Sequence, residues 1–156
     1  MGTLPFENQV ITITLNGSSL IKTLEIGARS NGETSKGEFL QVSGLRVVYD
    51  YSKPSYSRVV SVKARCGTCR VPIYEPVVAD KLYNIVTLSF LVGGGDDHYI
   101  IRDADNKKTQ DLADVDTVVW YLSKQSPVYP EEQGRIEFIE HKESDKSLGS
   151  RRIGPT

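Results

Sequence analysis

The sequence predicts an α+β fold with a mixed, largely antiparallel sheet and two or three helices. Residues 9–15 alternate apolar and polar side chains, the period of a strand that buries one face. Residues 114–122 instead repeat apolar side chains at i, i+3, i+4 and i+7, the period of an amphipathic helix. The two kinds of segment do not alternate regularly along the chain, so a doubly wound parallel sheet is not expected.

The first strand leads into a turn and then a helix. Asn16 and Gly17 turn the chain, and Ser18 is the expected N-cap of the helix. One face of this helix carries Leu20, Ile21, Leu24 and Ala28. The polar, glycine-punctuated residues 29–37 predict an exposed loop after it.

An antiparallel meander is expected next. Its strand-like runs are residues 39–42, 45–49 and 59–64, with a turn at 51–57. Pro72 and Pro76 then break the chain. The following run, residues 81–90, is rich in β-branched and aromatic side chains and predicts a buried strand.

Three glycines at 93–95 end that strand and are followed by Asp96 and Asp97. Glycine allows positive φ and close approach of a ligand, so this turn would present Asp96 at the mouth of a sheet. The remaining expected elements are a short helix at 98–102, a loop at 103–108, a helix capped by Asp114, and a closing strand at 135–139. Trp120 and Tyr121 of the capped helix are expected to be flank and packing residues rather than ligand contacts. An EF-hand in the acidic loop is excluded because Lys107 occupies a ligand position and the required glycine is missing.

Composition indicates one ordinary globular domain. The chain has 156 residues, of which 38% are hydrophobic and 25% charged. A formal net charge of -1 gives no electrostatic reason to expect nucleic acid or an anionic membrane as a partner. No apolar run approaches the roughly 20 residues of a membrane helix.

The glycine turn does not carry a phosphate-binding motif. No Gly-Lys-Ser or Gly-Lys-Thr follows the three glycines, and the dinucleotide fingerprint fails at its third glycine, where this chain has His98. The two carboxylates of the turn would also repel a phosphate.

The two cysteines, Cys66 and Cys69, are compatible with a redox motif, half a zinc site or a small structural disulfide. Zinc would need further ligands, and the only histidines are His98 and His141. A redox pair opens a helix, whereas the proline-containing residues 71–76 cannot form one.

Several motifs resemble the C-terminal domain of the 5'-nucleotidase and apyrase family, which includes animal ecto-5'-nucleotidases and secreted salivary apyrases. They include Phe-Leu-Val-Gly-Gly-Gly-Asp at 90–96, Gly-Glu-Phe-Leu-Gln-Val-Ser-Gly at 37–44 and Cys-Gly-Thr-Cys-Arg-Val-Pro at 66–72. The resemblance runs in order from residue 4 to residue 140. We therefore interpret residues 1–140 as part of such a domain and residues 141–156 as a polar tail, expected to be disordered.

The resemblance implies that this domain recognises a nucleoside and performs no chemistry itself. Phe39 and Phe90 would stack on the two faces of a purine, and Asp96 would accept hydrogen bonds from the ribose hydroxyls. The alternative is that both phenylalanines are core aromatics. The family continues its motif with Gly-Phe where this chain has Asp97 and His98. Asp97 would then adopt positive φ at some cost, and its charge is expected to weaken binding of a charged nucleotide.

Catalysis in this family belongs to a separate N-terminal metallophosphatase domain with a pair of divalent ions, zinc or similar. We therefore expect no cofactor in this chain and no hydrolysis by it alone. The family pattern also implies a Cys66–Cys69 disulfide and an oxidising, extracellular location. In a secreted protein, the sequon Asn16-Gly17-Ser18 makes Asn16 a glycosylation candidate.

Two functions follow as expectations. The first is the nucleoside-recognition portion of a secreted 5'-nucleotidase or apyrase that hydrolyses extracellular nucleotides. Its partners would be a purine nucleoside or nucleotide, bound weakly, the metallophosphatase domain and, as in animal ecto-enzymes, a second copy in a homodimer. The alternative is a non-catalytic, salivary-type secreted protein that binds a host haemostatic protein or a nucleotide.

Overall fold

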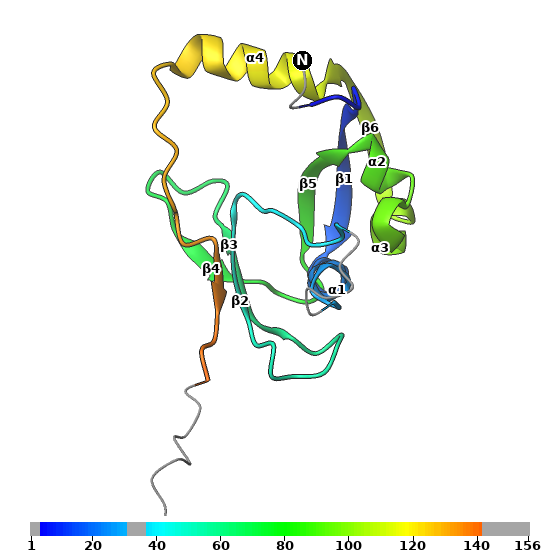
Figure 1. Cartoon of the computed structure of the whole chain (residues 1–156), viewed down its shortest axis with the longest axis vertical. Helices are drawn as coiled ribbons and strands as arrows, with labels where there is room; N and C mark the ends of the chain where they lie inside the picture. The colour runs from blue at the N-terminus through cyan, green and yellow to red at the C-terminus, as the bar shows by residue number, and fades with distance from the viewer. Residues whose placement is uncertain (1–3, 31–36, 142–156) are drawn as a thin grey trace, which may run out of the picture.

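The computed structural model of the chain describes residues 4–30 and 37–141, which form two sheets with helices between and beside them (Figure 1). The expected α+β class is confirmed. Within the described residues no helix is both long enough and apolar enough to cross a bilayer.

The first sheet has the strand order β5-β1-β6. Its central strand β1 (Gln9–Asn16) pairs antiparallel with β5 (Leu82–Leu88) and with β6 (Asp105–Ala113). The predicted alternation in β1 is confirmed: Ile11, Ile13 and Leu15 are buried in a cluster with Ile101.

The second sheet has the order β4-β3-β2-β7. It consists of β2 (Leu45–Tyr49), β3 (Val59–Arg65), β4 (Tyr74–Pro76) and β7 (Ile136–Phe138). All pairs are antiparallel except β2 with β7, which is parallel. Val47, Tyr49 and Val62 of this sheet form the second core cluster with Leu24 and Ala28.

Helix α1 (Gly17–Gly27) contacts β1 of one sheet and β3 of the other, so it joins the two cores. The side-chain oxygen of Asn16 accepts a hydrogen bond from the Ser19 amide at 2.8 Å, which makes Asn16 the N-cap and not Ser18 as expected. Three short elements follow β5: α2 (Ser89–Val92), the 3₁₀ turn η1 (Gly95–Asp97) and α3 (Tyr99–Arg102).

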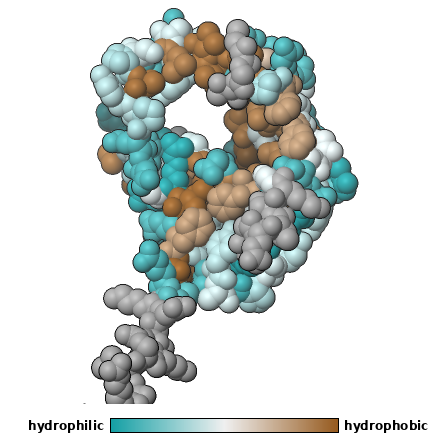
Figure 2. All heavy atoms as spheres, in the orientation of Figure 1, coloured by the Kyte–Doolittle hydropathy of each residue, from teal (hydrophilic) through white to brown (hydrophobic). Residues whose placement is uncertain are grey.

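Helix α4 (Asp114–Gln125) lies at one end of the molecule, beside β6 and away from the second sheet (Figure 1). Its cap is Ala113, with Asp114 as the first helical residue. Trp120 and Tyr121 are 63% and 52% exposed, so they lie on the flank of the helix and are not packed in the core. Hydrophobic side chains are visible along this helix at the surface (Figure 2).

The strand expected at residues 81–90 ends at Leu88. Its partner β1 begins at Gln9, whose amide donates to the Ser89 hydroxyl at 3.1 Å. With no further partner strand, the chain turns into α2 despite the β-propensity of Phe90. Phe90 therefore lies on a helical turn and not in a buried strand.

Three other expectations are also wrong. Residues 39–42 form no strand, because the segment around Glu38 and Leu40 crosses Gly27 of α1: a Cβ built there would lie 3.1 Å from the Glu38 carbonyl oxygen. The expected loop at 103–108 overlaps β6, whose Asp105 and Lys108 pair with β1. Pro72 and Pro76 were expected to break the chain, but Tyr74–Pro76 form the short strand β4, where Pro76 is tolerated because β4 lies at the sheet edge.

A buried carboxylate and a buried guanidinium connect α1 to the second sheet. Glu25 accepts hydrogen bonds from the backbone amides of Arg58 and Val59 at 2.9 and 2.8 Å. Arg58 Nη1 donates to the carbonyl oxygens of Ala28 and Ser30 at 2.6 and 2.8 Å. The end of the helix and the start of β3 therefore satisfy one another's polar groups.

We expect Glu25→Ala to lower the free energy of unfolding by roughly 2–4 kcal/mol, because it leaves two backbone amides without an acceptor. Glu25→Gln should cost less, since its amide oxygen can still accept. Chemical denaturation measures both, with the exposed Glu75→Ala as a control expected within about 0.5 kcal/mol of the parent. Equal effects of Glu25→Ala and Glu75→Ala would contradict this role.

Candidate functional site

Two segments far apart in sequence meet beside α1. One resumes at Gly37 and carries Phe39, and the other is the glycine turn that carries Asp96. A Cβ built on Gly37, which has φ of +93°, would lie 3.8 Å from Asp96 Oδ2. The fully buried ring of His98 places Nε2 3.0 Å from the carbonyl oxygen of Glu38. Because a carbonyl only accepts, Nε2 carries the proton and donates.

The turn itself is held in an uncommon backbone conformation. Asp96 and Asp97 have φ of 52° and 63°, and Gly94 has φ of 88°. Aspartate tolerates the left-handed region better than most residues. The positive φ expected at Asp97 is confirmed.

The Asp97 carboxylate is bound to an arginine. Arg29 Nη2 lies 2.8 Å from Asp97 Oδ2, and Arg29 Nε lies 3.9 Å from Glu38 Oε1. The hydrogen bond to Asp97 raises the pKa of Arg29 above its ordinary value. The arginine offsets the negative charge that Asp97 adds to the turn.

Phe39 is half-buried in an aromatic cluster. Its ring centre lies 5.5 Å from that of Tyr49 and 6.2 Å from that of Phe138. Phe138 in turn lies 5.6 Å from Tyr51. These contacts support the Phe39 ring from the core-facing side of β2 and from β7.

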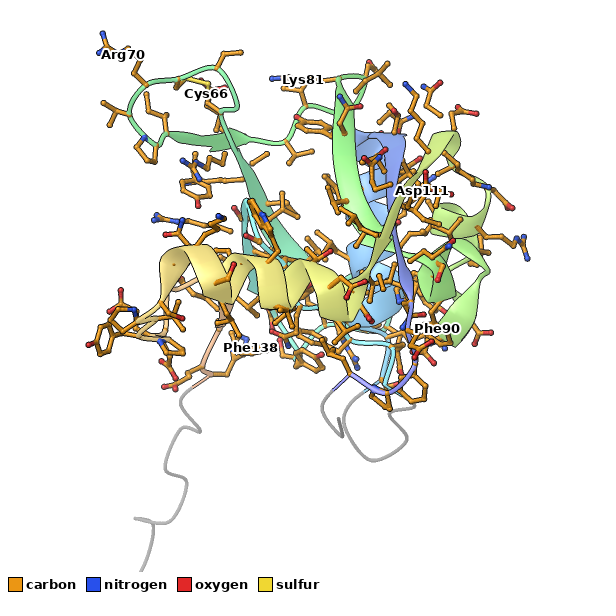
Figure 3. All side chains as sticks on the ribbon, turned by 90° about the horizontal axis from the view of Figure 1, so that it is seen from above. Cys66, Arg70, Lys81, Phe90, Asp111 and Phe138 are labelled. Atoms are coloured by element: carbon orange, nitrogen blue, oxygen red, sulfur yellow. A yellow bond between two sulfur atoms is a disulfide. The ribbon has the colours of Figure 1, made fainter. Side chains whose placement is uncertain are left out.

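Phe90 is 49% exposed and covers the glycine turn. A Cβ on Gly95 would lie 2.4 Å from the Phe90 ring, so glycine is required there. In the described part of the chain the Phe39 and Phe90 rings make no direct contact. A purine between them would need rings about 7 Å apart, since stacked carbons lie about 3.5–4.0 Å from one another. Phe90 and Phe138 both lie on the side of the molecule away from Cys66 (Figure 3).

Comparison with known proteins identifies the fold. The model of the family "5'-nucleotidase, C-terminal domain" matches residues 1–102. The chain belongs to the 5'-nucleotidase family.

Rat 5'-nucleotidase is 44% identical over 86% of this chain, which corresponds to 23% of the rat protein. A 5'-nucleotidase-related protein of Glossina morsitans morsitans is 41% identical over 86% of this chain and 24% of its own length. The crystal structure of a 5'-nucleotidase precursor from Thermus thermophilus superposes with a TM-score of 0.80 at 31% identity, covering 88% of this chain and 26% of that one. The chain thus spans about a quarter of the length of these relatives.

This member of the 5'-nucleotidase family also contains two cavities that do not involve the predicted residues. A cleft of about 930 Å³ opens between the sheets, and an apolar cavity of about 140 Å³ lies behind it. Neither is lined by Phe39, Phe90 or Asp96. Both are lined by Leu20 of α1, residues 41–43 of the loop before β2, Leu45, and residues 85–86 of β5, so they are gaps between the two sheets and not a preformed nucleoside pocket.

Both cysteines are joined in a Cys66–Cys69 disulfide, as the family resemblance implied. The two histidines have other partners: His98 contacts the Glu38 backbone and His141 contacts Asp50. Within residues 4–30 and 37–141 no group of three or more His, Cys, Asp or Glu side chains could hold a metal ion.

Sequence reasoning missed Arg29, Glu38 and His98 as members of the site. His98 was visible only as a departure from the family motif, and its bond to the Glu38 backbone spans 60 residues. The Arg29–Asp97 pair spans 68 residues and had no sequence signal.

Asp50 supports the aromatic cluster at the end of β2. It accepts hydrogen bonds from the amide and hydroxyl of Ser52 at 2.9 and 2.6 Å, and it lies 2.9 Å from His141 Nε2. These bonds, first those from Ser52 and then that from His141, lower the pKa of Asp50 to about 2. His141 thereby ties the chain after β7 to the end of β2.

We expect an NMR titration of the Asp50 carboxyl carbon to show a pKa of about 2. Because this pKa is lowered on folding, the contribution to stability is complete above about pH 4 and is lost as the pH falls towards 2. Ser52→Ala should raise the pKa more than His141→Ala does, and Asp116→Asn on exposed α4 should leave it unchanged. An Asp50 midpoint near pH 4 in the parent protein would contradict the assignment.

Proposed function

We propose that this chain is the nucleoside-recognition portion of a secreted 5'-nucleotidase or apyrase that hydrolyses extracellular nucleotides. Hydrolysis would occur in a separate metallophosphatase domain with two divalent ions, zinc or similar, and this chain would supply substrate specificity. The observation that carries the proposal is the direct bond between His98 and the Glu38 backbone, which links the segment of Phe39 to the turn of Asp96. Three residues expected to bind a nucleoside thus lie on two segments that are held together.

The chemistry of these residues suits a nucleoside. Phe90 is half exposed and Phe39 is backed by Tyr49 and Phe138, so each offers a ring for stacking on a base. Asp96, aimed towards Gly37, is an acceptor that can take both hydroxyls of a cis-diol. One carboxylate oxygen of Asp97 is already bound by Arg29, so Asp97 is less suited than Asp96 to accept hydrogen bonds from both ribose hydroxyls.

We expect adenosine to bind this chain with a Kd of about a millimolar. Two stacking contacts at roughly 1–3 kcal/mol each, less the entropy cost of association, leave little more than about 4 kcal/mol. Phe90→Ala should abolish detectable binding, whereas Tyr129→Ala, which removes an 84% exposed aromatic residue outside the site, should not change it. NMR signals of the Phe39 and Phe90 rings measure the binding.

The role of Asp96 is tested with a second ligand. The parent protein should prefer adenosine over 2',3'-dideoxyadenosine, and Asp96→Asn, which tolerates the same backbone conformation, should reduce that preference by roughly three- to tenfold. If neither phenylalanine responds at several millimolar adenosine, the nucleoside proposal is wrong.

A second candidate is a non-catalytic secreted protein that binds a host haemostatic protein. The exposed apolar side chains of α4 offer a surface for a protein partner or for a homodimer. Saturable binding to a haemostatic protein without adenosine binding would favour this candidate. Adenosine binding without binding to a haemostatic protein would favour the first candidate.

Secretion and glycosylation belong to the same proposal. The snake venom 5'-nucleotidase of Macrovipera lebetinus is 38% identical over 88% of this chain, and the Cys66–Cys69 disulfide suits an oxidising compartment. Asn16 is exposed at the junction of β1 and α1. Its oxygen caps the helix, and its nitrogen is the atom that would carry the glycan.

We expect the chain to gain one N-linked glycan when a eukaryotic host secretes it. Asn16→Gln and Ser18→Ala should both remove the glycan, which mass spectrometry detects. Only Asn16→Gln also removes the helix cap, so it should cost about 1 kcal/mol of stability relative to Ser18→Ala in unglycosylated protein. An unmodified Asn16 in secreted parent protein would contradict the expectation.

A further inference from the structure

The outer face of the second sheet carries a group of cations. In the antiparallel register Arg46 of β2 stands opposite Lys63 of β3, and Arg65 of β3 stands opposite Tyr74 of β4. Their neighbours Val47 and Val62 are buried in the core, so alternation along the strands places the three cations on the opposite, outward face. All three are exposed. We call Arg46, Lys63 and Arg65 the basic face.

A cation–π contact shows that these side chains share one surface. The Arg46 guanidinium carbon lies 4.4 Å from the centre of the Tyr74 ring. Because β3 lies between β2 and β4, the Arg46 side chain reaches across β3 on the same face as Lys63 and Arg65. The contact also restricts Arg46, so less entropy is lost when it binds a ligand.

The basic face has no structural counter-ion among the described residues. Like charges directly opposite on a sheet are destabilising, as Arg46 and Lys63 are here. No ion pair in the described part of the chain involves any of the three cations. Two acids lie near the basic face in the sheet register: Glu75 of β4 stands opposite Ala64, whose parity is that of the core-facing residues, and Glu137 of β7 stands opposite Val48. The repulsion between these cations therefore costs stability that no ion pair among the described residues offsets, although the Arg46–Tyr74 contact offsets part of it.

We propose that the basic face binds a sulfated polysaccharide. Neighbouring strands are about 4.8 Å apart and alternate residues of one strand about 7 Å apart, so the cations form a flat group that can meet sulfates on successive sugars. Arginine forks bind planar or tetrahedral anion groups with two hydrogen bonds each. Tyr74 adds an aromatic surface beside them. The proposal does not depend on the nucleoside site, which involves the other face of β2.

The number of cations favours a glycan over nucleic acid. Proteins that bind duplex DNA commonly neutralise about 6–10 phosphates, whereas the basic face offers three cations on a chain of net charge -1. The next cation along the chain, Arg70, projects from the tip of the disulfide loop (Figure 3) and lies between β3 and β4, outside the paired strands that carry the basic face.

Heparin is the probe for the first test. Titration of the full chain with a size-defined heparin oligosaccharide should show saturable binding, with log Kd rising against log salt with a slope of about 2–3 for three contacts. The triple variant R46A, K63A and R65A should weaken binding by roughly 10- to 100-fold. R46K, which keeps the charge but loses the fork, should have a smaller effect.

A matched control removes the same charge elsewhere. The variant K22A, K108A and K124A takes three exposed lysines from α1, β6 and α4 and should retain heparin binding. If the triple variant of the basic face does not fold, Lys63→Glu alone replaces it and should weaken binding at least about tenfold.

The proposal is overturned if the two triple variants bind heparin equally, because net charge alone would then explain the affinity. It is also overturned if single-stranded DNA of equal charge, or vesicles with anionic lipid, bind the parent as tightly as heparin does and lose binding in the same variant. Adenosine binding should remain unchanged in the triple variant of the basic face, so failure here and failure of the nucleoside proposal are separate results.

Discussion

The hydrogen bonds that the buried side chains of Glu25 and Arg58 make to backbone groups are the constraint on which the site depends. A buried carboxylate and a buried guanidinium are tolerated only when each is fully hydrogen-bonded, and here each binds the backbone of the other's element. The end of α1 therefore has one position relative to β3. The chain leaves α1 through Arg29, which binds Asp97 of the glycine turn. The buried hydrogen bonds of Glu25 and Arg58 thus fix the end of α1, from which the chain continues to Arg29 and its contact with the glycine turn.

The two departures from the family motif act together where the Phe39 segment meets the glycine turn. The resemblance implies Gly-Phe at these two positions, whereas here Asp97 binds Arg29 and His98 donates to the Glu38 carbonyl. His98 Nδ1 is buried without a hydrogen-bond partner in the described structure, a cost of about 1–3 kcal/mol for such a group. The bond through Nε2 and the packing of the ring offset that cost. A polar link through His98 therefore joins the two segments.

Local patterns predicted the parts of the fold that depend on local physics. The alternation in β1, the apolar face of α1 and the periodicity of α4 follow from residue order alone, and all three elements are present. The prediction that Phe90 lies in a strand was wrong because a strand needs a partner strand, and β1, the partner of β5, begins at Gln9. The strand predicted at residues 39–42 is absent because this segment packs on Gly27 of α1 and not beside another strand. The resemblance supplied Phe39, Phe90 and Asp96, but contacts across 60 residues or more, such as that of His98, could not be read from the sequence.

Strand alternation separates the two proposed functions on one sheet. Tyr49 faces the core and supports Phe39, while its neighbours of opposite parity, Val48 and Arg46, face outward. A substitution on the outer face therefore changes charge without altering the packing of the aromatic cluster. The core-facing side is constrained by volume and close packing, whereas the outer side is constrained only by solubility and pairing. Three cations without an ion pair among the described residues, on the less constrained side, are consequently better explained by a ligand than by the needs of the fold.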